Sequence, residues 1–401
     1  MNAQELLKNA QALQDEIQAN RRELHRHPEL GLDMVFTKAF VVEKLKEMGY
    51  EPADCGEGGV VVTVGGKKGG KCFLIRGDMD ALPVNEESGV DYASETPGKM
   101  HACGHDTHTA MMLGAAKLLK TMEDELEGTV KLMFQPGEET LQGAVAMVEA
   151  GVLENPHVDA AMMIHSSTGL PIPKGMFLVM EGGYGSASCD QYKITVQGKG
   201  GHGAMPHLTV DPITAAAHIH VALAEIHSRE LESTTFGVIT SGMFHAGVAP
   251  NVIADVAEME GTIRTGDPKV EEMLMTRVRE IAETVAKAYR CEAKVEFVKH
   301  CPPMIADVAV TEAALSYMQE LLGQGAQKMS TLTGSTKVAG GSEDFAFVSA
   351  KVPCTAMMLS MAGADSKYPQ HHPKAVFEDD VLFHGSAAYA HVAMRWLADN
   401  K

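Results

Sequence analysis

The chain has 401 residues, of which 45% are hydrophobic and 22% charged, the balance of an ordinary folded, water-soluble protein. Its formal net charge is −19, from 34 lysines and arginines against 53 aspartates and glutamates. Such an acidic chain argues against nucleic acid as a partner, because phosphate binding needs a basic face. The length exceeds that of most single hydrophobic cores, so we expect two domains.

The sequence carries no sign of a membrane or secretory destination. Its N-terminal segment lacks the charged-then-apolar pattern of a signal peptide, and no apolar run reaches the roughly 20 residues that span a bilayer. The 7 cysteines are an odd number and are scattered, which is typical of a reducing compartment. We therefore expect a cytoplasmic protein without a membrane partner.

The first part of the chain alternates helical and strand-like segments. Helices are predicted over 2–27, 34–48, 110–119 and 141–150. Asp106 or Thr107 is the expected N-cap of the third of these helices. Short, continuously apolar strands are predicted over 60–64, 72–75, 130–134 and 160–164. This alternation predicts an α/β sheet covered by helices on both faces.

The pattern changes near residue 188 and changes back near residue 301. Between these points the predicted elements are strands over 191–197, 235–240, 257–264 and 292–298, and helices over 211–227 and 267–289. Their βαββαβ order is that of a ferredoxin-like domain, here an insertion over 188–300. The first domain would comprise 1–187 and 301–401, with a helix over 311–322, a strand over 356–361 and a last helix ending at Trp396.

The segment His101-Ala-Cys-Gly-His-Asp-Thr-His108 is the most informative stretch of the sequence. Thiolate, imidazole and carboxylate groups together favour a divalent ion of intermediate softness. Within it, Cys103 and His105 are the expected ligands, and His101 and His108 are expected to support them.

Further candidate ligands follow the ends of predicted strands. They are Asp78 and Asp80, Gln135–Glu139, His165, and the pair His371 and His372. Ligands bind at the carboxyl ends of strands in an open α/β sheet, so we expect these groups to converge on a metal-assisted hydrolase site. Taken singly, each has a simpler interpretation: Glu138-Glu139 also suits a solvated helix start, and each histidine also suits an ordinary strand end.

The chain resembles the M20 metallopeptidases, and within them the amidohydrolase branch of aminoacylases, hippurate hydrolases and plant auxin-conjugate hydrolases. The matching motifs span nearly the whole chain. They are Glu23-Leu-His-Arg-His-Pro-Glu-Leu-Gly31, Arg76-Gly-Asp-Met-Asp-Ala-Leu-Pro83, Met100–His108, Gln135-Pro-Gly-Glu-Glu139, Gly200-Gly-His-Gly-Ala-Met-Pro-His207, Asn251-Val-Ile-Ala-Asp255, Gly341-Ser-Glu-Asp-Phe345 and His371-His-Pro373. The resemblance implies a catalytic α/β domain with a mixed, mostly parallel sheet, and an inserted ferredoxin-like lid through which the chain dimerises, or forms a tetramer.

The resemblance also assigns roles to residues. It implies two divalent ions (zinc, manganese, cobalt or nickel) held by Cys103, His105, Glu139, His165 and His372. Glu138 would be the general base that activates water at the metal, and Asp80 would orient the site. The substrate would be an N-acyl or N-aroyl amino acid, hydrolysed to a carboxylic acid and a free amino acid.

In the lid, the resemblance implies that His202 stabilises the oxyanion, acting from the partner subunit. Asn251, Arg264, Gly341 and Ser342 are the expected contacts to the substrate carboxylate; Arg264 suits a structural salt bridge equally well. The sequence departs from the branch after His165, where Ser166-Ser-Thr168 replaces the usual aromatic residue and proline. That change alters the pocket wall and leaves the preferred acyl group open.

Other functions remain open at this point. A dipeptidase or carboxypeptidase of the same family is the nearest alternative, although such branches usually carry an aspartate bridge and a histidine where this chain has Asp78. A non-enzymatic binding protein would lack ligands or the base, and all are present. A structural zinc protein would have a closed four-ligand site without an adjacent glutamate pair.

Overall fold

The computed structural model describes residues 1–333, 341–363 and 366–401. The chain divides into two compact units. The first comprises Met1–Gly185 with the described parts of Ile305–Lys337 and Phe347–Lys401, and the second comprises Ser186–Met304 with the described part of Val338–Ala346. The domain boundaries expected from the sequence did not include this last return of the chain to the second unit.

The first unit is built on an eight-stranded sheet with the order β1-β2-β4-β3-β5-β16-β6-β15. The strands are β1 (Ala53–Asp54), β2 (Val60–Gly65), β3 (Cys72–Asp78), β4 (Thr129–Gln135), β5 (Ala160–Ser167), β6 (Phe177–Val179), β15 (Ala326–Lys328) and β16 (Cys354–Ser360). The pairs β3-β4, β3-β5, β5-β16 and β6-β15 are parallel, and the other three are antiparallel. The predicted mixed, mostly parallel α/β sheet is confirmed, and β3 is buried along its whole length because it lies inside the sheet.

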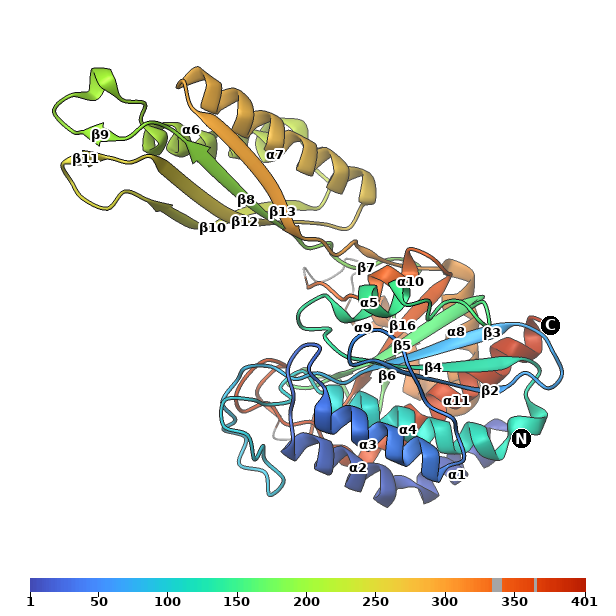
Figure 1. The fold of residues 1–401 in the computed structure, drawn as a ribbon. Coiled ribbons are helices and arrows are strands. Elements are labelled where there is room, and N and C mark those ends of the chain that lie inside the picture. Colours follow the sequence, from blue (N-terminus) through green and yellow to red (C-terminus); the bar gives the residue numbers. More distant parts are fainter. Residues whose placement is uncertain (334–340, 364–365) are drawn as a thin grey trace. The chain divides into compact units, whose positions relative to one another are not determined.

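Helices pack on this sheet, and Figure 1 shows α2, α3 and α4 together on one side of it. In the first unit, the described helices of eight or more residues are α1 (Ala3–Ala12), α2 (Gln14–Arg26), α3 (Val35–Glu47), α4 (His105–Thr121), α8 (Val308–Leu322) and α11 (Leu382–Asp399). Shorter helices include α5 (Gly143–Glu149), α9 (Met329–Thr333) and α10 (Ala346–Ser349). The main hydrophobic core lies between the sheet and helices such as α4 and α11. Among the described residues, no helix combines the length and the apolar character needed to cross a bilayer.

Two local predictions were wrong. The single helix expected over 2–27 is two helices, because the Leu13 N–H bonds the carbonyl three residues back, at Ala10, and closes the first helix. The N-cap of α4 is Gly104 rather than Asp106 or Thr107. Thr107 instead lies in the first turn and donates its hydroxyl to the Gly104 carbonyl oxygen at 2.6 Å.

The second unit has the ferredoxin-like arrangement. Its elements are β8 (Asp190–Gln197), α6 (Pro212–Glu225), β10 (Gly237–Ala246), β12 (Val256–Thr265), α7 (Pro268–Ala288) and β13 (Glu292–Lys299). The strands form one antiparallel sheet in the order β10-β12-β8-β13, and a second hydrophobic core joins this sheet to both helices. A short pair, β9 (Gly201–His202) with β11 (Val252–Ile253), lies at one end of the sheet (Figure 1). The strand predicted over 235–240 begins at Gly237 and continues to Ala246.

Candidate metal centre and active site

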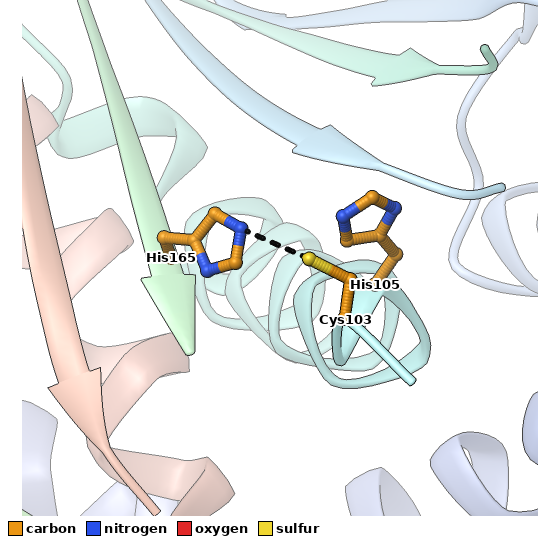
Figure 2. Close-up of side chains that lie close together, drawn as sticks. All are labelled: Cys103, His105 and His165. Carbon is orange, nitrogen blue, oxygen red and sulfur yellow. Dashed lines mark hydrogen bonds between the residues drawn. The ribbon is translucent and has the colours of Figure 1, made fainter. Parts of the chain in front are cut away.

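The candidate metal ligands of the first unit come together at one edge of its sheet. Cys103 and His105 flank the start of α4, His165 is near the end of β5, and Glu138 and Glu139 follow β4. Figure 2 shows His165 extending from the end of β5 toward Cys103, with His105 beside them. The convergence follows from parallel strands, whose carboxyl ends meet at the same edge.

Cys103 has two histidines around its sulfur. His165 Nε2 lies 3.6 Å from Cys103 Sγ (Figure 2), and His371 Nε2 lies 3.2 Å from the same atom. Potential ligand atoms of Cys103, His105 and His165 lie within 4.8 Å of one another, and those of Cys103, Glu139 and His371 form a second such group. Cys103 therefore belongs to two overlapping sets of metal-ligating atoms.

Gly104 makes the close spacing of Cys103 and His105 possible. Its φ of +91° lies in the left-handed region, which favours glycine. A Cβ at this position would lie 2.8 Å from Cε1 of Phe377, a buried aromatic side chain. The turn therefore needs glycine both for its backbone conformation and for space.

Asp80 holds the glutamate pair in place. Its Oδ1 accepts a hydrogen bond from the Glu138 N–H at 3.0 Å, and its Oδ2 accepts one from the Glu139 N–H at 3.1 Å. The same carboxylate lies 3.3 Å from His105 Nδ1, so Nε2 of that ring faces the remaining groups. Glu138 Oε2 is 4.0 Å from His105 Nε2, and Glu139 Oε1 is 3.5 Å from His371 Nε2. One fully buried aspartate thus positions three of the candidate groups.

Asp78 belongs to a buried network beneath the site. It forms an ion pair with Arg76 at 2.7 Å and hydrogen bonds Nδ1 of His108. The Ser166 N–H donates to His108 Nε2 at 2.7 Å, so both nitrogens of that ring are engaged. His108 therefore supports the sheet edge next to His165.

A second buried network surrounds Asp106, the residue after His105. Its Oδ2 lies 2.7 Å from Arg21 Nε and 2.7 Å from His25 Nδ1, and His25 Nε2 lies 3.2 Å from Glu86. Burial alone would raise the pKa of Asp106, but Arg21 and His25 hold that pKa well below its usual range. The start of α4 is thus fixed to α2 by a buried ion pair.

The side chains present suit a bound divalent ion. Among the described residues, His105 Nε2 and Glu139 Oε1 are buried polar atoms without a hydrogen-bond partner. Burial lowers the pKa of His165 to about 3, so its ring is the neutral form that binds metals. Burial also raises the pKa of the Cys103 thiol far above its usual range, and a nearby cation is what would hold it as a thiolate. The mixture of sulfur, nitrogen and oxygen donors fits zinc and its neighbours in the transition series.

The structure differs from the sequence analysis over the last ligand. His371, not His372, lies against Cys103 and Glu139. His372 stacks on Tyr368 with ring centroids 4.3 Å apart, and its Nδ1 accepts the Lys374 N–H. His371 has a positive φ of +66°, which turns the two neighbouring rings to different surroundings. Sequence spacing alone does not distinguish two adjacent histidines.

Sequence reasoning also missed Gln370. Its Nε2 lies 3.7 Å from Cys103 Sγ and 3.3 Å from His165 Nδ1. The sequence signal for Gln370 was its position directly before two histidines, in the loop after β16.

The candidate substrate residues of the second unit form two separate groups. His202 pairs with Val252 in the short β9-β11 ladder, next to Asn251, whose carbonyl oxygen accepts the Gly203 N–H. Both His202 and Asn251 are exposed. At the other end of β12, Arg264 donates to the Ser342 hydroxyl at 2.9 Å, and the Gly341 carbonyl accepts the Ala187 N–H.

The two groups are far apart within one chain. Val256, where β12 begins, and Arg264 are eight residues apart, about 25 Å at roughly 3.3 Å per residue of strand. The β9-β11 ladder, which contains His202, lies beyond the Val256 end (Figure 1). The second unit of one chain therefore does not bring His202 and Arg264 to the same small molecule.

Comparison with known proteins gives this geometry its context. Residues 74–395 match the model of peptidase family M20/M25/M40. An N-acetylcysteine deacetylase of Bacillus subtilis is 35% identical over 93% of this chain and 95% of its own length. Thermostable carboxypeptidase 2 of Saccharolobus solfataricus is 36% identical over 99% of both chains, and the hippurate hydrolase of Campylobacter jejuni is 33% identical over 96% of this chain and 97% of its own.

Solved structures agree with the sequence relatives. A protein of methicillin-resistant Staphylococcus aureus designated an aminohydrolase has a TM-score of 0.91 and 32% identity, over 99% of this chain and 100% of its own. A dinuclear metal-binding peptidase of the M20 family from Bacillus subtilis has a TM-score of 0.81 and 32% identity, over 96% and 99% of the two chains. The chain therefore belongs to peptidase family M20/M25/M40, in its amidohydrolase branch, and is a hydrolase that acts on amides.

Proposed function

We propose that this enzyme uses two divalent ions to hydrolyse the amide bond of N-acyl or N-aroyl amino acids, releasing a carboxylic acid and a free amino acid. The observation that carries the proposal is the convergence of Cys103, His105, His165 and Glu139, with Glu138 beside them. A solved relative is described as dinuclear, and Cys103 belongs to two overlapping ligand sets here. His371 replaces His372 as the proposed fifth ligand.

The substrate class follows from what the relatives' names have in common. N-acetylcysteine and hippurate are acylated amino acids, and a carboxypeptidase removes a C-terminal residue. In each case the scissile amide nitrogen belongs to an amino acid with a free carboxylate. A substrate of this class needs a cationic or N–H donor for that carboxylate. Arg264, Asn251 and the Gly341-Ser342 segment are the groups that we propose for it.

Glu138 is the proposed general base. Its Oε2 would take the proton of the attacking water and deliver it to the nitrogen of the leaving amine. The bound ions would lower the pKa of that water and polarise the amide carbonyl. Asp80 keeps the Glu138 backbone fixed, which limits the positions that its carboxylate can take.

His202 is the proposed donor to the tetrahedral oxyanion, acting on the active site of a second subunit. Two observations support action in trans: His202 is exposed, and it lies at the opposite end of β12 from Arg264. A short ladder that presents an unburied imidazole is suited to a neighbouring molecule rather than to the unit that carries it.

We propose that the second unit forms the dimer through α6 and β10. Val221 of α6 is 70% exposed, and Phe244 of the edge strand β10 is 42% exposed. Val221 and Ile239 also line a groove between these two elements. An edge strand offers unpaired backbone groups to a second copy of the chain. Val221→Asp should therefore shift the protein toward the monomer in light scattering, whereas an unchanged mass would exclude this face.

A substrate panel tests the proposed activity. Metal-reconstituted enzyme is given hippurate, N-acetyl amino acids, an auxin conjugate and several dipeptides, and the free amine is measured. We expect the acylated amino acids to be hydrolysed, and their methyl esters to be much poorer substrates. Equal rates on acids and esters would contradict carboxylate recognition.

The second candidate function is a carboxypeptidase or dipeptidase. It is favoured by the 36% identity to thermostable carboxypeptidase 2 over 99% of both chains. The same panel separates the two functions, because this alternative requires dipeptides to be hydrolysed faster than every acylated amino acid.

A further inference from the structure

A second group of metal-ligating side chains lies in the second unit, apart from the residues of the proposed reaction. Asp190 is the first residue of β8, His300 directly follows β13, and Glu271 is in the first turn of α7. One ligand atom from each of the three residues lies within 4.8 Å of those of the other two. The group therefore unites two strands and a helix of one unit.

Strand pairing explains why Asp190 and His300 meet. Gln191 pairs with Lys299, and Cys189 and Cys301 exchange both backbone hydrogen bonds. Asp190 and His300 therefore face one another across the two strands, with His300 Nδ1 2.6 Å from Asp190 Oδ1. Glu271 Oε1 lies 3.9 Å from the same nitrogen.

Both carboxylates are buried and retain unused oxygens. Asp190 is 0% exposed and Glu271 is 7% exposed. Within the described part of the chain, Asp190 Oδ2 and Glu271 Oε1 have no hydrogen-bond partner. Two buried carboxylates this close need a proton or a cation between them.

The side chains also suit a bound cation. Two carboxylate oxygens and an imidazole nitrogen are ligands that zinc and manganese accept. His300 is 51% exposed, so the group opens to solvent on one side and has room for water to complete the coordination. Metal binding would release the proton that lies between His300 and Asp190.

We propose that Asp190, Glu271 and His300 form an additional site for a divalent transition-metal ion, separate from the ions of the active site. The ion would link β8, β13 and α7 where the chain enters and leaves the second unit in sequence, near Ser186 and Met304. Its role would be structural, because three side chains of one unit hold it and no residue assigned to the reaction belongs to the group.

Metal stoichiometry tests the proposal on the full-length protein. Wild type and Glu271→Gln are loaded with zinc, dialysed, and measured by elemental analysis. We expect Glu271→Gln to hold one zinc fewer per chain than wild type. Glu272→Gln is the matched control, because it removes the neighbouring exposed carboxylate of the same helix and should keep the full zinc content.

Two further measurements make the result decisive. His300→Ala removes the exposed donor and should also hold one zinc fewer per chain than wild type. This variant keeps the test valid even if Glu271→Gln folds poorly. Cobalt titration separates the sites, because only the active site contains a thiolate, Cys103, and shows sulfur-to-cobalt charge transfer. The cobalt ion that both variants lose should lack that band. Equal zinc content in wild type, Glu271→Gln and His300→Ala would overturn the proposal and leave a shared proton as the explanation.

Discussion

The two units of this enzyme present their candidate functional groups in opposite ways. In the first unit, Cys103, His105 and Glu138 are buried, and aspartates such as Asp80 hold the surrounding groups in place. In the second unit, His202 and Asn251 are exposed on a short two-stranded ladder. The first unit brings the proposed ligands and the proposed base together within one fold. The proposed substrate-facing groups His202 and Asn251 stay exposed.

The largest expected effect is on turnover, through the buried groups of the first unit. Glu138→Gln removes the proposed base while keeping its size, so turnover should fall about 10²–10⁴-fold. The metal content should stay near that of wild type, as measured by elemental analysis. Glu139→Gln, at the adjacent residue, is the comparison variant, because it should lose metal as well as activity. A Glu138→Gln enzyme with near-normal turnover would remove Glu138 as the base.

The buried ion pair behind His105 should affect stability. Asp106→Asn removes the carboxylate charge that lies 2.7 Å from Arg21 and leaves that guanidinium with the more distant Asp379, at 3.8 Å, so the free energy of unfolding should fall by about 3–5 kcal/mol. Denaturant unfolding of the metal-free protein measures this change. Asp91→Asn, at an exposed aspartate, is the control and should change little. A small loss for Asp106→Asn would mean that water reaches this network.

His202 tests the catalytic role of the exposed groups in the second unit. His202→Ala should lower kcat about 10²–10³-fold, the usual cost of losing an oxyanion donor. Mixing inactive His202→Ala subunits with inactive Glu138→Gln subunits should restore part of the activity, because a mixed dimer contains one intact combination. If mixing restores nothing, His202 acts within its own chain or has no catalytic role.

The adjacent histidines of the loop after β16 offer a matched pair. His371→Ala should weaken metal binding by about tenfold or more, because the ring lies against Cys103 and Glu139. His372→Ala should leave the metal affinity unchanged and lose only its stacking on Tyr368. Competition with a metal chelator measures both affinities, and the reverse order would restore His372 as the ligand.

The smallest expected effect is on the pH dependence of stability in the second unit. The pKa of Glu271 is raised to about 8 in the folded protein, so the folded state holds a proton that the unfolded state releases above about pH 4.5. Stability of the metal-free protein should therefore fall as pH rises toward 8, by about 1–2 kcal/mol above pH 6. Glu271→Gln should flatten this slope in thermal unfolding, and an unchanged slope would contradict the raised pKa.

The sequence predicted the parts of the site that depend on regular structure. Continuous apolar strands gave the α/β sheet, and the groups after those strands converged because parallel strand ends share an edge. The βαββαβ order likewise gave the ferredoxin-like unit, because apolar alternation in β12 marks its buried face.

The parts that the sequence missed depend on single backbone angles or on distant packing. His371 and His372 differ by the positive φ of His371, which no residue pattern signals in a non-glycine residue. Asp106 resembled a helix cap because it is an acidic residue near the start of α4. Its side chain instead forms an ion pair with Arg21 of α2. The group of Asp190, Glu271 and His300 combines residues from three separate parts of the chain, which spacing does not reveal.

The hydrogen bonds to Asp80 have a consequence for how the enzyme matures. The Asp80 carboxylate anchors both backbone N–H groups of the glutamate pair and the nearby imidazole of His105. These contacts lie within the protein, whereas small zinc domains are unfolded until a metal is bound. We expect the newly made protein to fold first and acquire its ions afterwards. The metal supply of the cell would then decide which ion the finished enzyme carries.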